Sequence, residues 1–327
     1  MRDQEDKTAT DEVKSSVSFN EITENNSGQR IDNYLLSLLK GVPKSRIYKI
    51  VRKGEVRVNK GRVKPDYKLK LGDTVRVPPV RVAQKQDGIS SLPGWVREAL
   101  QTPIFEDEHI IALNKPSGLA VHGGSGNPYG VIEAMRFLYP EWPFLELAHR
   151  IDRQTSGCLL LAKSRPILNE LHTQFRREGE SAIEKTYLAI LTGDPLSEPK
   201  TVEAEIGQAR DAEGLNKARI DSHGQTAKSV FMPLESVQGY SVARIALYTG
   251  RMHQARVHAA FLNRPIIGDS LYGNWQVNKA AERHGVKRCM LHSETYQFKH
   301  PGTGKTVKLK APISEDFALA KAALINQ

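Results

Sequence analysis

The stretch LELAHRIDRQTSGCLLLA at residues 145–162 decides the fold of the larger part of the chain, because it joins two apolar runs through a polar loop. Short apolar runs bounded by turn residues predict buried β-strands. The loop carries the carboxylate of Asp152 beside His149, Arg150 and Arg153. Loops held by rigid strands often present functional groups, and nearby positive charge favours an ionised carboxylate. Asp152 is therefore a candidate nucleophile or base.

A purely structural role is the alternative for Asp152, as a cap of the turn or as a partner of Arg153. Against this alternative, a polar loop between two apolar strands must find a hydrogen-bond partner for each of its polar groups. The chain has no comparable second acid motif. A glycosidase with two catalytic carboxylates is therefore disfavoured.

Two further junctions follow the same pattern, at residues 110–118 (IIALNKPSG) and at residues 245–262 (IALYTGRMHQARVHAAFL). The first predicts a strand that breaks into a tight turn. The second predicts a strand that ends at Gly250 and a helix that begins there, so that Arg251 can reach into a cleft. A surface salt bridge is the alternative for Arg251.

The segment EKTYLAI at residues 184–190 predicts another strand, and it carries Tyr187 beside apolar neighbours. In such a setting a tyrosine is more typical of the core than of a site. From this segment alone we expect a core residue.

Several kinds of site are excluded by the sequence. His253 and His258 are five residues apart, not the spacing of about three or four that places two metal ligands on one helical face. The glycines at residues 123–126 lack the flanking residues of a P-loop and the context of a dinucleotide fingerprint. We therefore expect no metal and no nucleotide cofactor. Cys158 and Cys289 are expected to be small buried residues rather than nucleophiles.

The overall composition is that of a soluble protein, with 26% charged and 39% hydrophobic residues in 327. No run approaches the roughly 18 apolar residues that a membrane span needs, and the N-terminus lacks the apolar stretch of a secretion signal. We expect a cytoplasmic protein, and a monomer. Its length suggests two domains.

The net charge of +10 is concentrated in one short segment. Residues 1–28 hold three basic and seven acidic groups, whereas residues 29–82 hold fifteen basic and four acidic groups. We interpret residues 1–28 as a flexible acidic tail and residues 29–82 as a small basic domain. Residues 83–101, rich in Gln, Ser, Gly and Pro, are the expected linker, and residues 102–327 form the larger domain that carries the candidate site.

Within the basic domain, apolar spacing predicts two short helices, joined near Gly41 and with the second stopped by Gly54. Alternating residues predict strands at residues 55–58 and 74–77. The stretch RIDNYLLSLLKGVPKSRIYKIVRKGEVRVNK resembles the small RNA-binding domain first seen in ribosomal small-subunit protein four.

Arg46, Lys49 and Lys53 fall along one stripe of the second predicted helix, opposite its apolar face. A solvated charged surface is one interpretation of this stripe. However, an excess of one sign confined to so short a segment repels itself unless an anion neutralises it. We therefore expect these three side chains to bind nucleic acid.

Five segments of the larger domain resemble, in order, the pseudouridine synthases of the RluA/RluC/RluD family: NKPSGLAVHGGSG at 114–126, HRIDRQTSG at 149–157, KTYLAI at 185–190, TGRMHQARVH at 249–258 and LHSETYQFKHPGTGK at 291–305. The resemblance implies an α+β chain. Its pseudouridine synthase catalytic fold would have a mixed, mostly antiparallel sheet and a central cleft, preceded by the small α/β RNA-binding domain. The residues alone give only many short strands and a few helices.

The same resemblance implies a role for each matching residue. Asp152 would be the catalytic aspartate, and Arg251 the arginine that pairs with it. Tyr187 would stack on the target base, and Arg150 would fill the space left by a flipped nucleotide. The implied activity is the isomerisation of specific uridines in 23S ribosomal RNA to pseudouridine, with no cofactor.

The expected partner is 23S ribosomal RNA or an assembly intermediate of the large subunit. A non-catalytic, RNA-binding assembly factor that keeps the synthase fold is the alternative. This alternative predicts that residues needed for catalysis have been replaced, whereas Asp152, Tyr187 and Arg251 are all present. A hydrolase is disfavoured by the lack of a second acid.

Overall fold

The computed structural model describes residues 12–13, 16–39, 41–82, 89–124, 129–177, 183–210 and 216–325. The chain divides into two compact units, Met1–Ser90 and Ser91–Gln327. The division falls inside the predicted linker, of which residues 83–88 lie outside the described ranges. The linker prediction is wrong for residues 94–101, because they form helix α3 (Gly94–Gln101), whose Val96 and Leu100 are buried.

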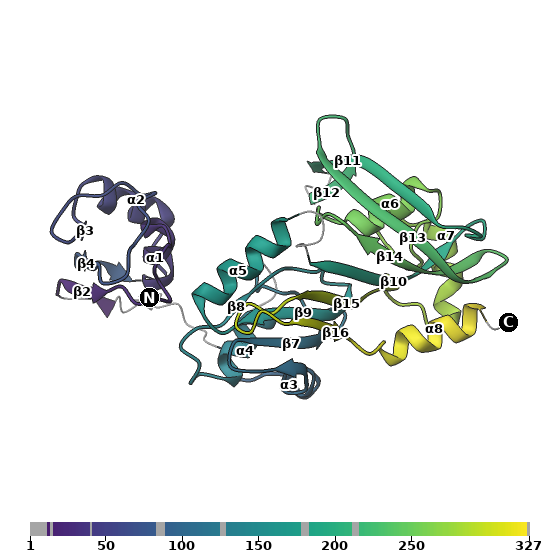
Figure 1. Cartoon of the computed structure of the whole chain (residues 1–327), viewed down its shortest axis with the longest axis horizontal. Coiled ribbons are helices and arrows are strands. Elements are labelled where there is room, and N and C mark those ends of the chain that lie inside the picture. Colours follow the sequence, from purple (N-terminus) through teal and green to yellow (C-terminus); the bar gives the residue numbers. More distant parts are fainter. Residues whose placement is uncertain are drawn as a thin grey trace, which may run out of the picture. The chain divides into compact units, whose positions relative to one another are not determined.

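The first unit combines two helices with short strands (Figure 1). Its elements are β1 (Glu12–Val13), β2 (Ser18–Glu21), α1 (Ile31–Leu38), α2 (Lys44–Arg52), β3 (Arg57–Val58), β4 (Thr74–Val77) and β5 (Arg81–Val82). Three strands pair in the order β2-β4-β3, and β1 pairs with β5. Buried side chains from α1, α2 and β4 form its core, including Leu35, Ile47 and Val75. The two predicted helices are confirmed.

The flexible acidic tail predicted at residues 1–28 is wrong for its second half. Strand β2 pairs with β4 in antiparallel register, from Ser18↔Val77 to Glu21↔Thr74. Ile22 is only 1% exposed, and its backbone N–H donates to the Asp73 carbonyl at 2.8 Å. A four-residue strand among polar residues has too weak a hydrophobic pattern to be recognised without its partner strand. Residues 1–11 lie outside the described ranges.

The second unit is built on a long mixed sheet with helices packed beside it (Figure 1). The strand order is β12-β11-β13-β14-β10-β15-β9-β7-β6, with β16 on β15 and β8 on β9. Among the strand pairs described, β15 with β9 is parallel and the others are antiparallel. The predicted α+β fold with a mixed, mostly antiparallel sheet is confirmed.

The bounds of these strands and helices follow the chain in order. They are β6 (Pro103–Glu106), β7 (Ile110–Lys115), α4 (Val131–Leu138), β8 (Glu146–Leu147), β9 (Ser156–Ala162), α5 (Arg165–Arg176), β10 (Glu184–Thr192), β11 (Lys200–Arg210), β12 (Asn216–Ile220), β13 (Gln225–Val237), β14 (Tyr240–Leu247), α6 (Gln254–Phe261), α7 (Trp275–Ala281), the 3₁₀ helix η2 (Glu282–His284), β15 (Leu291–Lys299), β16 (Thr306–Lys310) and α8 (Glu315–Ile325). No helix in the described ranges is long and apolar enough to cross a membrane.

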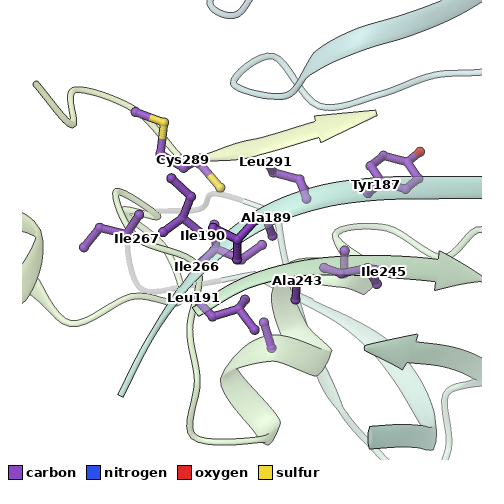
Figure 2. Packing of buried hydrophobic residues seen from close by; sticks show 14 of the residues in the cluster. Tyr187, Ala189, Ile190, Leu191, Ala243, Ile245, Ile266, Ile267, Cys289 and Leu291 are labelled. Atoms are coloured by element: carbon purple, nitrogen blue, oxygen red, sulfur yellow. The ribbon is translucent and has the colours of Figure 1, made fainter. Parts of the chain in front are cut away.

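Two of the hydrophobic clusters in this unit meet at a pair of tyrosines, Tyr187 and Tyr296. One cluster holds Tyr187 with buried residues of β10, β14, α6 and α8, and the other holds Tyr296 with residues of β7, β9 and α5. Figure 2 shows the Tyr187 ring at one end of the first cluster, on the strand that also carries Ala189 and Leu191. The prediction of a core tyrosine is therefore confirmed.

Both cysteines are buried, as predicted from their small apolar character. Burial raises the pKa of the Cys158 thiol to about 12. It also raises the pKa of Cys289 well above its ordinary value. Neither thiol has the thiolate character of a nucleophile at neutral pH.

Gly157 sets the distance between β9 and β15. Its φ of +108° is in the region that favours glycine, and a Cβ there would lie 2.2 Å from the Ser293 carbonyl oxygen. Gly157 pairs with Ser293 of β15 and with Lys115 of β7, so the clash would fall inside the sheet.

We predict that Gly157→Ala lowers the free energy of unfolding by at least about 2 kcal/mol, because backbone must move to admit the methyl group. Gly239→Ala is the matched control, since Gly239 also has a positive φ, of +86°, but has no atom within 4 Å of the added Cβ. Urea denaturation of both variants measures the difference. Equal losses would contradict the role assigned to the β9–β15 contact.

Candidate active site

A cavity of about 260 Å³ opens at the middle of the large sheet, where β14, β10, β15 and β9 are neighbours. Asp152 and Arg150 line it from the loop before β9, Tyr187 from β10, and Arg251 from the loop after β14. Segments far apart in the sequence therefore bring the four predicted residues of the larger domain to one cavity. Its volume is slightly below the range of about 300–1,000 Å³ that is typical of sites for drug-sized ligands.

Asp152 is held by Arg256, a residue that the sequence analysis did not single out. Arg256 Nη1 donates to Asp152 Oδ2 at 3.0 Å. The side chain of Asp152 keeps 24% of its surface exposed, whereas that of Arg256 is buried. The contacts found for this carboxylate in the described part of the chain are both made by Oδ2, which leaves Oδ1 available to a substrate.

Arg256 is itself fixed by the fully buried Asp269. Its Nε donates to Asp269 Oδ2 at 2.7 Å and its Nη2 donates to Oδ1 at 2.8 Å. Backbone N–H groups of Leu271 and Tyr272 also donate to Oδ1. Burial alone would lower the pKa of Arg256 and raise that of Asp269. Their hydrogen bonds and opposite charges outweigh burial, so the pKa of Arg256 is raised and that of Asp269 is lowered.

His253 lies on the other side of the same Asp152 oxygen. Its Nε2 is 3.8 Å from Asp152 Oδ2, and its Nδ1 shares a hydrogen bond of 2.8 Å with the Tyr272 hydroxyl. Burial lowers the pKa of His253, against the opposing effect of Asp152. His258 instead bonds to Ser229 Oγ through Nδ1 at 2.9 Å. The two histidines of this motif therefore have different partners.

The predicted pairing of Arg251 with Asp152 is wrong. Arg251 Nε donates to the Thr226 carbonyl at 3.0 Å, and its backbone N–H donates to Gln254 Oε1. The loop containing Arg251 ends at helix α6, which begins at Gln254 rather than at residue 251. The second arginine of the motif, Arg256, lies in the first turn of α6 and is the one that reaches the carboxylate.

Tyr187 lines the cavity together with two polar residues near it, Tyr296 and His149. Its hydroxyl is 3.0 Å from that of Tyr296, which lies 3.5 Å from His149 Nδ1. The backbone N–H of Leu160 donates to His149 Nε2 at 3.0 Å, and burial lowers the pKa of His149 to about 3. Burial also raises the pKa of Tyr187. At neutral pH the cavity is therefore lined by a protonated phenol and an uncharged imidazole.

Lys115 ties the loop of Asp152 to the turn that follows β7. Its ammonium Nζ is fully buried and donates to the carbonyls of Pro116, Leu119 and Arg153, at 2.8, 2.8 and 3.2 Å. Burial lowers the pKa of Lys115 to about 7, although the nearby Asp152 charge opposes this shift. Arg153 is occupied in the same junction, because its Nε donates to the Gly118 carbonyl. The alternative in which Asp152 pairs with Arg153 is therefore wrong.

The cavity wall carries further positive charge. Arg150 is exposed at this loop. Lys185 lines the cavity from β10, and burial followed by the charge of Arg251 lowers its pKa to about 8. A cavity with several cationic groups around one carboxylate is suited to an anionic ligand.

In the first unit, Arg46, Lys49 and Lys53 are exposed on and just after α2, as the stripe predicts. The missed residues belong to the second unit. Arg256 stands in TGRMHQARVH, where it could have been weighed against Arg251. Asp269 follows the apolar run Ile266-Ile267 in IIGDSLYG, a strand-to-turn junction of the kind that drew attention to Asp152.

Comparison with known proteins gives two family matches. Residues 109–261 match the family described as RNA pseudouridylate synthase, and residues 29–75 match the S4 domain. The chain is 44% identical to "Ribosomal large subunit pseudouridine synthase C" of Pasteurella multocida (strain Pm70), over 96% of each chain. It is 45% identical to the protein of the same name in Escherichia coli (strain K12), over 92% of this chain and 94% of that one.

Solved structures show the same fold. The match to "Human RNA Pseudouridylate Synthase Domain Containing 4" has a TM-score of 0.57 at 22% identity, and covers 70% of this chain and 95% of that one. "Human RNA Pseudouridylate Synthase Domain Containing 1" gives a TM-score of 0.55 at 23% identity, with 68% and 86% covered. At these identities the likeness concerns the fold alone.

We predict that Arg256→Met lowers the free energy of unfolding by about 3–5 kcal/mol, because Asp269 would stay buried without its cationic partner. Arg251→Met removes the same charge from the same loop and helix start. It should cost less than about 1.5 kcal/mol, because only the hydrogen bond to the Thr226 carbonyl is lost. Thermal and urea unfolding of both variants test this. Similar losses would mean that the Arg256–Asp269 pair is not a structural anchor.

Proposed function

The chain belongs to the RNA pseudouridylate synthase family, and from this premise we propose that it isomerises specific uridines of 23S ribosomal RNA to pseudouridine. Its relatives named as large-subunit synthases match over more than nine-tenths of its length. The observation that carries the proposal is Asp152, held through one oxygen by Arg256 at the floor of a cavity that Tyr187 also lines.

The reaction breaks the bond from the ribose C1′ to N1 of uracil and makes a bond from C1′ to C5, while C5 loses its proton and N1 gains one. It involves no net oxidation, reduction or hydrolysis, so we propose that it needs no cofactor. Asp152 can attack the sugar or the base, or can remove a proton from the sugar, and each route starts from a carboxylate with one free oxygen. Arg256 keeps that carboxylate oriented throughout.

The target uridine must leave its helical stack to reach this cavity, which costs a few kcal/mol. We assign Tyr187 to stacking on the flipped base, since its ring forms part of the wall. We assign Arg150, exposed at the rim, to the space that the nucleotide vacates. We assign Arg251 and Lys185, which also line the cavity, to the flanking phosphates.

We further propose that the chain acts in the cytoplasm, as a monomer, on 23S ribosomal RNA or on a large-subunit assembly intermediate. The alternative is an assembly factor that binds RNA without catalysis. A map of pseudouridines in 23S ribosomal RNA from cells with and without the gene distinguishes the two. The alternative would be favoured by identical maps.

We predict that Asp152→Asn lowers the rate of pseudouridine formation by at least about a hundredfold, because the amide keeps the size of the side chain but loses its charge and nucleophilicity. Affinity for the RNA should persist. Asp66→Asn is the control, since it makes the same change at an exposed position of the other unit. A single-turnover assay measures both variants, and wild-type rates in Asp152→Asn would eliminate the mechanism.

RNA docking is assigned to the first unit, where Arg46, Lys49 and Lys53 share the exposed side of α2. Each phosphate that a protein neutralises releases counterions, so affinity falls with salt in proportion to the number of such contacts. The basic segment at residues 29–82 carries nearly all the excess charge of the chain. It is therefore expected to dominate the salt dependence.

Replacing Arg46, Lys49 and Lys53 together by Gln should make the slope of log K against log salt shallower by about 2, at 0.7–0.9 per lost contact. The control replaces three exposed lysines on or beside β16, Lys305, Lys308 and Lys310, and so removes the same total charge. Affinity for large ribosomal RNA is measured across a salt series. The docking assignment is wrong if both triple variants change the slope equally.

A further inference from the structure

The first unit contains a second basic surface, separate from the stripe on α2 except for Lys53. It is a groove of about 1080 Å³ beside the sheet β2-β4-β3. The residues that line it come from the three strands, from the segment between α2 and β3 and from the segment after β3: Phe19, Lys53, Gly54, Glu55, Arg57, Asn59, Lys60, Arg62, Thr74 and Arg76. Five of these residues are cationic and one is acidic.

A row of three side chains crosses the solvent face of this sheet. Phe19 of β2 is directly opposite Arg76 of β4, and Arg76 is directly opposite Arg57 of β3. Residues paired across strands project from the same face. Their neighbours Val58 and Val75 are buried in the core, so the row itself faces outward.

Phe19 is 68% exposed, which is unusual for a ring held in a regular strand. Among the described residues of this unit, the packing does not require an aromatic ring there, because the buried core lies on the opposite face of the sheet. A large apolar ring beside two arginines combines the two features of a platform for single-stranded nucleic acid, namely a stacking surface and a cationic track.

The backbone around the groove directs more cations toward it. Gly54 has a φ of +71°, and a Cβ at this position would lie 2.6 Å from Arg62 Nε. The absence of a side chain at residue 54 therefore makes room for Arg62. Asn59 and Lys60, with φ of +48° and +68°, are the two central residues of the tight turn between Val58 and Gly61, and this turn brings Lys60 to the lining of the groove. Arg76 is anchored by donating to the Glu55 carbonyl at 2.6 Å.

We propose that this groove binds an unpaired segment of RNA, with one base stacked on Phe19 and the neighbouring phosphates on Arg57, Arg62 and Lys60. The inference rests on the proposed action on ribosomal RNA and adds the kind of RNA structure that the first unit recognises. A continuous double helix keeps its bases stacked on one another, so it cannot supply the base that Phe19 needs. The unit therefore selects loops, bulges or strand ends.

Phe19 belongs to a part of the chain outside the matched S4 domain at residues 29–75. Strand β2 adds this residue to the sheet through its register with β4. The stacking surface is thus a contribution of the segment before the matched domain, whereas Arg57 and Arg62 come from within it. Both parts are needed to complete the groove.

The test uses the full-length chain and two fluorescent RNA probes of equal length, one single-stranded and one a blunt double helix. Phe19→Ala should weaken binding of the single-stranded probe by about tenfold, while the slope of log K against log salt stays unchanged, because no phosphate contact is lost. Arg62→Gln should instead make that slope shallower by about 0.7. Binding of the double helix should respond little to Phe19→Ala.

Leu71→Ala is the matched control, because Leu71 is a 62% exposed apolar residue of the same unit that does not line the groove. The proposal is overturned if Phe19→Ala binds the single-stranded probe like the wild type, or no worse than Leu71→Ala does. An equal loss for both probes also overturns it. Activity on a short stem-loop containing the target uridine is assayed in parallel. Suppose that Phe19→Ala weakens binding of the single-stranded probe but that no protein, the wild type included, forms pseudouridine in the stem-loop. That result would refute the proposed function but not this RNA-binding site.

Discussion

The guanidinium of Arg256 is the group on which the geometry of the candidate active site depends. It is buried between Asp269, which it binds through two hydrogen bonds, and Asp152, which it binds through one. A buried charge costs several kcal/mol unless it is paired, and this arrangement satisfies it on both sides. The structural pair with Asp269 therefore fixes the start of α6, and the remaining donor positions the carboxylate that faces the cavity.

The loop that carries Asp152 is held near its junction with β9 by two contacts that depend on residue charge and size. Lys115 binds the Arg153 carbonyl and the turn after β7, so the loop cannot move without breaking buried hydrogen bonds. Four residues after Arg153, Gly157 lets β9 approach the backbone of β15. These contacts hold the loop, and with it the Asp152 carboxylate, in a fixed position relative to the sheet. Fixed charged groups of this kind are what electrostatic preorganisation describes.

The sequence predicted the strand–loop junctions well, because apolar runs on both sides of a polar loop give a strong local pattern. Asp152, Tyr187, Arg150 and Arg251 do reach one cavity. The sequence did not show which arginine binds Asp152, because the choice between Arg251 and Arg256 depends on the residue at which α6 begins. Asp269 is distant from Asp152 in the sequence and is linked to it only because Arg256 binds both carboxylates in the folded chain. Strand β2 was not predicted because its four residues show a strand only through their pairing with β4.

The position of β2 has a practical consequence for anyone who divides this protein into parts. The matched domain begins at residue 29, but β4 lies between β2 and β3 in the sheet. A fragment cut at that boundary would expose one side of β4 as an open edge and would uncover its neighbouring apolar residues. Open edges of this kind invite intermolecular strand pairing and aggregation. The polar segment in front of the domain thus protects its solubility.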